Sequence, residues 1–371
     1  MSTTVADPLR QAEARVYGRA QRRIALVDSA AGLAVLVVIT AAARPLGGIG
    51  SLAALAVVPA AVSLPFGLAG LRVSRAYGLS RQTRASWLAD HAKGAAIGLV
   101  LGVAGAAAVI AAQRFDDRLW PVLVGLGALA LSVALAVLFP VVLLPLFVKS
   151  ELLPVGPLAD ALWATVASSG VAVRELRVLH LGEKTSAGNA MVAGLGPTRR
   201  IYVGDTLSSD APEQERIAET CAVLAHELGH HATGDPWRLL AFSALPIAAG
   251  AAGAAVAVDR LAPHGAGRLD ALPALVLGFT LASAVVSPLG AWYSRRREVA
   301  ADAFAVTVSG HGEIFARALE RLAAQNLGEL WPPRLWHLLT ATHPRLGERI
   351  AGARGGGGSR RWRLPPRPTR R

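Results

Sequence analysis

Six apolar stretches dominate this sequence and limit the folds that are open to it. Each is near or above the roughly 20 residues that a helix needs to cross a bilayer, and the only charged residue in any of them is Asp28, in the first. Charged residues make up 17% of the chain, against about 25% in a soluble globular domain. The sequence therefore predicts a mainly α-helical, polytopic membrane protein. The predicted spans are Ile24 to Ala43, Leu52 to Leu71, Gly94 to Ala112, Leu119 to Val148, Leu239 to Val258 and Ala271 to Tyr293.

The fourth stretch is longer than one span requires and contains Pro121, Pro140 and Pro145. Proline lacks an amide N–H and clashes with the preceding helical turn. We therefore expect the fourth span to be kinked at these residues or to end near the membrane surface. A buried soluble helix is the alternative for the third stretch, which is rich in Ala and Gly, but its uncharged neighbours favour a span.

Charge in the connections predicts the orientation of the chain. The N-terminal segment 1–23 and the loop Arg72–Lys93 are basic, whereas Gln113–Arg118 and Asp259–Asp270 are neutral and Pro45–Ser51 is uncharged. Because basic loops stay on the cytoplasmic side, both termini and the polar segment 149–238 are predicted to be cytoplasmic. The same distribution accounts for the net charge of +13, and we expect no nucleic-acid partner.

The polar segment contains the motif His226-Glu227-Leu228-Gly229-His230. On a helix, residues four apart share a face, so both imidazoles could bind one Zn²⁺ while Glu227 points at the water that the metal holds. A capping box from Asp210 to Glu213 predicts the start of such a helix. His231 faces elsewhere and is left out of the ligand set, and Cys221, the single cysteine, is expected to be a buried thiol.

Glu298 is the candidate third ligand. The segment Ser294–Asp302 is predicted to be helical and to continue the sixth span, which places Glu298 and Asp302 on one face. Two predicted spans separate Glu298 from His230, so both lie on the same side of the membrane. Glu298 could then bind the metal, and Asp302 could accept the N–H of a liganding imidazole. The alternative is that both are solvated acids beside arginines.

Other patterns divide the chain further. Leu158–Ser168 is predicted to be an amphipathic helix, Val171–Leu181 and Arg200–Val203 to be strands, and Gly234-Asp235-Pro236 to break the motif helix. The tail after Gly352 is Gly-, Arg- and Pro-rich and is predicted to be disordered.

The expected divisions are an N-terminal segment (1–23), four spans (24–148), a small α+β domain with the motif helix (149–238), a two-span hairpin (239–293), a helix with the third ligand and a closing motif (294–351) and the tail (352–371).

Taken together, His226-Glu-Leu-Gly-His230 and Ser294-Arg-x-x-Glu298-x-x-Ala-Asp302 resemble the integral-membrane zinc endopeptidases of the CAAX prenyl protease type 1 group, which includes the HtpX-like heat-shock proteases. The resemblance covers about residues 72 to 350. Further matches favour the CAAX protease branch. They are Tyr77–Thr83 with Trp87 and Asp90, Pro145–Lys149, Asn189-Ala190 with Asp205-Thr206-Leu207, and His343-Pro344 with Arg349-Ile350.

The resemblance implies a zincin-like protease domain and roles for four more residues. Asn189 and Ala190 would lie on an edge strand beside the cleft, where substrate backbone adds as another strand. His343 and Arg349 would line the cleft and steady an oxyanion or a substrate carboxylate. From the residues alone, Gly188-Asn189 is also turn chemistry, and His343-Pro344 is also typical of a helix boundary.

Two features depart from the family pattern. Eukaryotic members have seven spans around a large intramembrane chamber, whereas six are predicted here, so the chamber could be smaller or open. Gly188 and Gly204 stand where larger residues are expected. These departures concern substrate preference and leave the metal chemistry unchanged.

The sequence thus predicts a membrane-embedded zinc metalloendopeptidase with one Zn²⁺ per chain and Glu227 as general base. Its substrates would be peptides or membrane proteins at the cytoplasmic face, and its Arg-rich, Lys-poor composition suggests a bacterial cell membrane. Without prenylation there, cleavage of a CAAX peptide would be a latent ability. The alternatives are a catalytically silent scaffold or transporter, and a signalling protease that cleaves one regulator.

Overall fold

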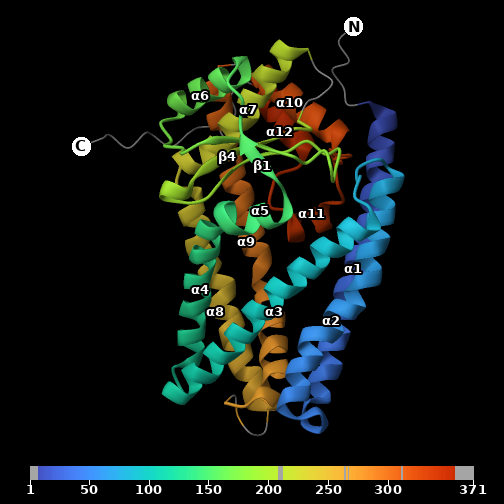
Figure 1. Cartoon of the computed structure of the whole chain (residues 1–371), viewed down its shortest axis with the longest axis vertical. Coiled ribbons are helices and arrows are strands. Elements are labelled where there is room, and N and C mark those ends of the chain that lie inside the picture. The colour runs from blue at the N-terminus through green and yellow to red at the C-terminus, as the bar shows by residue number, and fades with distance from the viewer. Residues whose placement is uncertain (1–6, 208–211, 263–264, 266, 311, 356–371) are drawn as a thin grey trace, which may run out of the picture.

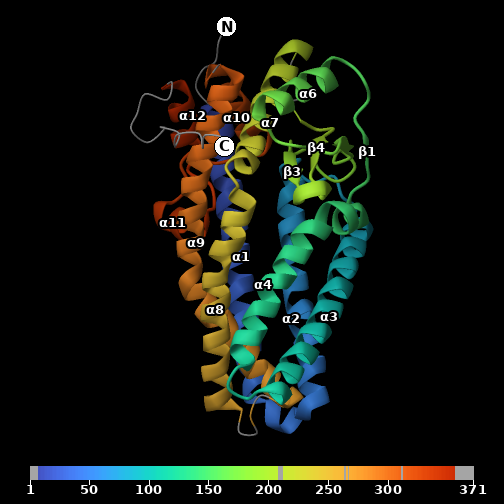
Figure 2. The same cartoon turned by 90° about the vertical axis from the view of Figure 1, so that its left-hand side faces the viewer.

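The protein is described by a computed structural model that covers residues 7–207, 212–262, 265, 267–310 and 312–355. Within these residues, a bundle of long helices carries at one end a smaller domain in which helices surround a four-stranded sheet (Figure 1). The view turned by 90° shows the same division (Figure 2). The architecture therefore separates an apolar bundle from a polar domain.

Six helices of the described chain are long and apolar enough to cross a membrane. This confirms the prediction of a polytopic, mainly α-helical membrane protein with a small α+β part. The spanning helices are α1 (Pro8–Ala41), α2 (Ala43–Ala76), α3 (Arg84–Phe115), α4 (Trp120–Leu138, continued to Phe147), α8 (Asp235–Leu261) and α9 (Leu272–Ser309, preceded by the short 3₁₀ turn η3, Leu269–Ala271).

Helix α1 begins well before the apolar stretch that predicted it. Asp7 caps the helix by accepting a hydrogen bond from the amide of Leu9 at 2.9 Å. The polar first turns then dock on the small domain, where Arg22 pairs with Glu329 at 2.7 Å. The N-terminal segment predicted over 1–23 is therefore helical from Pro8 and packs against the rest of the chain.

The prolines of the fourth span do not end it. Helix α4 continues through a π-helical turn, η1 (Phe139–Leu143), into α5 (Leu144–Phe147). Pro140 lies in the π-helical turn, the usual response of a helix to an extra residue in its ladder. The carbonyl of Pro140 accepts a hydrogen bond from the hydroxyl of Tyr202 at 2.8 Å. The irregular turn thus becomes an attachment point for the small domain.

The sheet of the small domain has the order β1-β2-β4-β3. Strands β2 and β4 are parallel, and β1 and β3 pair antiparallel at the edges. The predicted strand Val171–Leu181 shortens to Leu176–Leu179, whereas Arg200–Val203 is recovered with one more residue. The strands are β1 (Ser150–Leu152), β2 (Leu176–Leu179), β3 (Ala190–Ala193) and β4 (Arg200–Gly204), with the 3₁₀ turn η2 (Gly196–Thr198) before β4.

Helices pack on this sheet and complete two cores. Leu162 of α6 (Pro157–Ser169), Ile201 of the sheet and Leu228 of α7 (Glu213–Ala232) meet in the first core. Phe315 and Ile350 belong to the second core, which joins α7 and α9 to the C-terminal helices. The C-terminal helices are α10 (Gly312–Gln325), α11 (Arg334–Thr340) and α12 (Leu346–Arg354), of which α10 and α12 contribute to this core.

Two sequence predictions fall at the edge of the described chain. The predicted capping residue Asp210 lies outside the described residues, and α7 begins at Glu213 as expected. Helix α12 continues to Arg354, so the first residues of the predicted disordered tail are helical. Residues 356–371 lie outside the described part of the chain.

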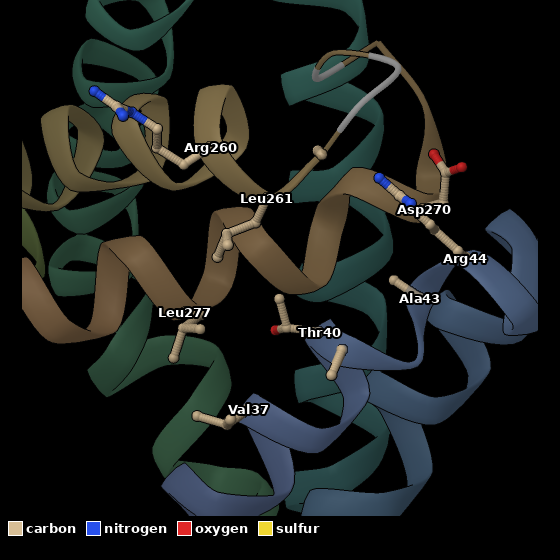
Figure 3. Close-up of a pocket in the computed structure, with 10 residues that line it drawn as sticks. Val37, Thr40, Ala43, Arg44, Arg260, Leu261, Asp270 and Leu277 are labelled. Atoms are coloured by element: carbon tan, nitrogen blue, oxygen red, sulfur yellow. The ribbon is translucent and has the colours of Figure 1, made fainter.

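Two cavities lie within the bundle. The larger, of about 910 Å³, is lined by apolar side chains from α1, α2, α3, α4 and α9, including Leu55, Leu99 and Leu131. The smaller, of about 330 Å³, lies where the α1–α2 and α8–α9 connections meet, at the end of the bundle remote from the small domain. Figure 3 shows Leu261 and Leu277 among its lining side chains and the Arg260 side chain pointing away from Arg44. The six-helix bundle therefore contains an apolar cavity that is partly open and not an enclosed chamber.

Helices α8 and α9 form a hairpin whose arms touch at glycines. A Cβ placed on Gly278 would overlap the carbonyl oxygen of Gly253, and one placed on Gly253 would overlap Ala282. Small residues of this kind let membrane helices approach closely. The contact fixes how the α8–α9 hairpin returns the chain to the small domain.

We predict that Gly278→Ala destabilises the protein although alanine favours helix by about 1 kcal/mol over glycine, because the added methyl forces α8 and α9 apart at a cost of about 1–3 kcal/mol. Thermal unfolding in detergent measures the effect as a lower midpoint. The control is Gly290→Ala in the same helix, where the new Cβ meets no atom within 4 Å. Equal midpoints for the two variants would contradict the close approach.

Candidate metal centre

Helix α7 carries both histidines of the motif into the interior. Its first turn contains Glu213 and Glu215, which suit the positive end of a helix dipole. Its buried face includes Ala225 and Leu228 and packs on α9. A Cβ at Gly229 would press against the Cα of Ala301 at 3.2 Å. The glycine of the motif therefore permits the close approach that brings α9 to the histidines.

Helix α9 places Glu298 between the two imidazoles. Nε2 of His226 lies 3.3 Å from Oε2 of Glu298, and Nε2 of His230 lies 3.2 Å from Oε1. One donor atom from each residue falls within 4.8 Å of the other two. The predicted set of His226, His230 and Glu298 is therefore brought together, as the hairpin topology required.

The donor set fits a zinc ion. Ligand atoms at about 2.0–2.1 Å from a tetrahedral zinc lie about 3.3 Å apart, close to the spacings from Glu298 to each imidazole. Oε2 of Glu298 is also buried, and the ring nitrogens of His226 and His343 lie 3.3 and 2.7 Å from it without making a well-oriented hydrogen bond. A buried carboxylate oxygen without such a bond is costly unless a cation meets it. The residues present thus suit a divalent ion with nitrogen and oxygen ligands.

Each imidazole is held from behind by a carboxylate. Nδ1 of His226 lies 2.8 Å from Asp302, and Nδ1 of His230 lies 2.9 Å from Asp235. A Nδ1–H that donates to a carboxylate leaves the Nε2 lone pair free for a metal. The structure therefore places Asp302 where the sequence predicted it and adds Asp235 in the same relation to the second histidine.

Asp235 was missed by the sequence analysis. Gly234-Asp235-Pro236 was interpreted only as a helix break, and the break is present, with Gly234 at φ 72° between α7 and α8. The left-handed turn folds the first residue of α8 back toward His230. Asp235 is fully buried and also pairs with Arg297 of α9. An acid five residues after the second histidine, just past a glycine turn, is the signal that could have revealed it.

Arg349 lies behind the site rather than in an open cleft. Its Nε and Nη2 atoms donate to the two carboxylate oxygens of Asp302 at 2.9 and 2.7 Å. Burial alone would lower the pKa of Arg349, but the charge and hydrogen bonds of Asp302 raise it above its usual value. Nη2 is 4.0 Å from Oε2 of Glu298. Arg349 is therefore a buried cation that keeps Asp302 ionised.

His343 and Glu227 approach the site from other directions. Nδ1 of His343, in the loop between α11 and α12, is 2.7 Å from Oε2 of Glu298. The side chain of His343 is 59% exposed, so it marks an open side of the site. Glu227 is half-buried on α7, and its charge acts on both His230 and Arg349. The two residues predicted to act on substrate thus flank the candidate ligands.

Ala190 lies on the edge strand β3, as the resemblance implied, and Asn189 directly precedes it. Asn326 fixes the approach to this strand, because it accepts a hydrogen bond from the amide of Gly188 at 2.9 Å and donates one to its carbonyl at 3.0 Å. A Cβ at Gly188 would lie 2.6 Å from Oε1 of Gln325. A side chain at position 188 would displace Gln325, whose amide donates to the carbonyls of Ser186 and Thr206.

His231 and Cys221 lie apart from the candidate ligands. Nε2 of His231 is 3.4 Å from the carbonyl oxygen of Val192 on β3. Burial, helped by the charge of Arg199, lowers the pKa of His231 to about 4, so it is neutral. Burial also raises the pKa of the Cys221 thiol, which disfavours the reactive thiolate.

Comparison with known proteins places these features in a family. The model of peptidase family M48 matches residues 160–355, and a model described as CAAX prenyl protease N-terminal, five membrane helices, matches residues 45–149. An uncharacterized metalloprotease, YhfN, of Bacillus subtilis is 27% identical over 318 residues, which cover 84% of this chain and 74% of that protein. A CAAX prenyl protease 1 homolog of Arabidopsis thaliana is 28% identical over 304 residues, 77% of this chain and 68% of its own.

A solved structure shares the fold. The crystal structure of S. mikatae Ste24p superposes with a TM-score of 0.77 and covers 94% of this chain and 89% of its own, at 20% identity. The likeness extends through both the helical bundle and the small domain. At this identity it bears on the fold alone.

We predict that Asp235→Asn weakens zinc binding about 10- to 100-fold, because the amide removes the charge that orients His230. Titration of the purified protein with a competing zinc chelator measures the affinity. Asp160→Asn, an exposed position on α6, is the matched control and should bind as the parent does. An affinity equal to that of the parent in Asp235→Asn would contradict the assigned contact.

Zinc uptake should release a proton. In the metal-free protein burial disfavours a charged His230, but hydrogen bonds with Asp235 and Glu298 outweigh it and raise the pKa of His230 to about 10. The imidazole is then protonated at neutral pH and must lose that proton to bind metal. Below pH 10 the zinc affinity should therefore rise with pH, by about tenfold per pH unit for each proton released.

Isothermal titration in two buffers of different ionisation enthalpy counts the protons released. A heat of zinc binding that does not depend on the buffer, together with an affinity that is flat across neutral pH, would contradict this prediction.

Proposed function

Because the chain belongs to peptidase family M48 and is a multi-pass membrane metalloprotease, we propose that it is a zinc endopeptidase that hydrolyses peptide bonds near the cytoplasmic face of the membrane. The observation that carries the proposal is the arrangement of His226, His230 and Glu298, with each imidazole backed by a buried carboxylate. That arrangement gives the ligand number and open side of a hydrolytic zinc site.

His226, His230 and Glu298 would hold one zinc ion per chain. Bound there, zinc supplies Lewis-acid polarisation of a peptide carbonyl and makes water a better nucleophile near neutral pH. Asp302 and Asp235 each accept a hydrogen bond from an Nδ1–H, so that the Nε2 lone pair of each imidazole would be available to the metal. Arg349 offsets the charge of Asp302 and so holds that carboxylate in its ionised form.

Glu227 is proposed as the general base. Its carboxylate would take the proton from the attacking water and return it to the nitrogen of the leaving amine. His343 is proposed to donate from its ring to the oxyanion that develops on the peptide carbonyl oxygen. The positions of the two residues support these roles. Glu227 directly follows the candidate ligand His226 on α7, and the exposed side chain of His343 lies against Glu298.

Substrate backbone is proposed to add to the free edge of β3. The amide of Gly204 donates to the carbonyl of Asn189 at 2.8 Å, so these two form a hydrogen-bonded pair. In an antiparallel ladder such pairs alternate, which turns the amide and carbonyl of Ala190 away from β4. An extended peptide could therefore pair with Ala190. Asn326 and Gln325 hold this edge in place from α10 and the turn after it.

The cytoplasmic assignment rests on the positions of the basic segments. The start of α1 and the loop after α2 lie at the same end of the bundle as the small domain (Figures 1 and 2). The loop contacts that domain directly, because Ser80 forms a bridge with Thr185 and Arg81 donates to the carbonyl of Gly182 at 3.2 Å. Basic segments favour the cytoplasmic side, and the candidate site goes with them.

We predict that Glu227→Gln keeps one zinc per chain but loses about 10²- to 10⁴-fold in peptide hydrolysis, the usual contribution of a positioned base. Metal analysis and peptidase assays on the protein in liposomes measure the two properties. Glu215→Gln, an exposed position on the same helix, is the control and should keep both. Full activity in Glu227→Gln would overturn the mechanism, and absence of zinc from the parent would overturn the metal site.

A further inference from the structure

Helix α11 exposes apolar side chains in the small domain. Leu335 is 70% exposed, Leu338 46% and Leu339 48%, and their spacing places them on one side of the helix. His337 is buried on another side. Trp331, just before the helix, is 60% exposed. Clustered exposed apolar side chains of this size mark an interaction surface, which we call the α11 face.

The α11 face lies at the level where the membrane ends. Nη1 of Arg295 on α9 donates to the carbonyl of Ala341, just past the end of α11, at 2.6 Å. Arg295 comes two residues after Tyr293, where the apolar stretch of α9 stops. Nearby, the guanidinium of Arg296 lies 4.3 Å from the ring centre of Trp292. An aromatic ring beside a cation is typical of the interface between hydrocarbon and headgroups.

The figures agree with this position. Both views place α11 beside α9, where the bundle of spanning helices meets the small domain (Figures 1 and 2). On α9 the exposed residues Val285, Leu289 and Trp292 form a stripe at helical spacing that leads toward α11. That stripe lies on a helix that is long and apolar enough to span a membrane, so in a bilayer its exposed side chains would meet lipid. The α11 face continues this exposed apolar surface.

Two contacts connect the α11 face to the candidate metal centre. After α11 the chain runs through Ala341 to His343, whose Nδ1 is 2.7 Å from Glu298. On the other side a Cβ at Gly347 of α12 would overlap the indole of Trp331, so ring and backbone are in close contact. Gly347 lies two residues before Arg349. The segment 341–347, which carries His343 and leads to Arg349, is thus joined at each end to the α11 face.

We propose that the α11 face is a lipid-binding surface that lies in the headgroup layer and positions the 341–347 segment against the metal centre. Its occupant is the bilayer interface, which accepts leucine and tryptophan side chains together with nearby arginines. Removal of the bilayer contact would leave α11 held to α9 through Arg295 but with its apolar side in water. His343 would then be held less firmly over Glu298.

The depth of α11 in the membrane tests the proposal without reference to catalysis. In a Cys221→Ser background, single Leu335→Cys and Leu338→Cys variants carry a nitroxide label, and the full chain is reconstituted in phosphatidylcholine–phosphatidylglycerol liposomes. We expect both labels to collide more with oxygen than with a water-soluble nickel chelate. The control, Val155→Cys, lies 96% exposed just before α6 and should show the reverse. Labels at 335 and 338 that behave as the one at 155 overturn the proposal.

The positioning role, which rests on the proposed function, is tested by activity. Leu335→Glu/Leu338→Glu should lose several-fold in peptide hydrolysis in liposomes and keep its zinc. Leu335→Phe/Leu338→Phe, which suits the interface, should retain activity, and the control Leu152→Glu, at a 61% exposed strand position, should be unaffected. Equal activity of the Glu and Phe double variants overturns the positioning role. An inactive parent would instead refute the proposed function and leave the depth measurement intact.

Discussion

The candidate site depends on the hairpin of spanning helices α8 and α9, in which α8 leads away from the small domain and α9 returns to it. Motif helix α7 and Glu298 are separated in sequence by the α8–α9 hairpin, and the ligands can meet only if its arms end on one side of the membrane. The contact between Gly253 and Gly278 fixes how α8 packs on α9. The close approach of Gly229 to Ala301 fixes the C-terminal part of α9 against α7. The packing of the membrane helices therefore determines whether the candidate metal ligands can meet.

Charge balance explains why so many ionised groups lie buried around the site. Glu298, Asp302 and Asp235 are three carboxylates, and the guanidinium groups of Arg297 and Arg349 offset two of them. Buried charges are tolerated when each is paired and hydrogen-bonded. Glu298 remains beside the two imidazoles, and in the proposed enzyme a divalent cation held by these three residues would balance its charge. The arginines thus stabilise the frame around the candidate ligands.

Much of this could be predicted from the sequence, because the signals were local. Long apolar stretches predicted the spanning helices, and the spacing of the motif with the helical pattern at Glu298 predicted the three candidate ligands that the structure brings together. Asp235 escaped because the turn at Gly234 was interpreted only as a helix break, although the acid directly after it was a local signal for a second carboxylate near His230. The pairing of Gly188 with Asn326 joins segments far apart in the chain, and only the fold reveals it. Pro140 was expected to kink the fourth span or to end it near the membrane surface, and it lies in a π-helical turn through which the helix continues.

The hydrogen bond from Tyr202 to the carbonyl of Pro140 has a consequence for how the enzyme sits in bilayers of different thickness. It attaches the central sheet to the top of a spanning helix, as Arg22 attaches α1 to the other side of the domain. The height of the reaction centre is therefore set within the polypeptide and not by the surrounding lipid. A thicker bilayer must be met by tilt of the molecule as a unit or by local thinning of the lipid, so hydrophobic mismatch would change the depth of the α11 face in the headgroup layer while the sheet keeps its place on the spanning helices.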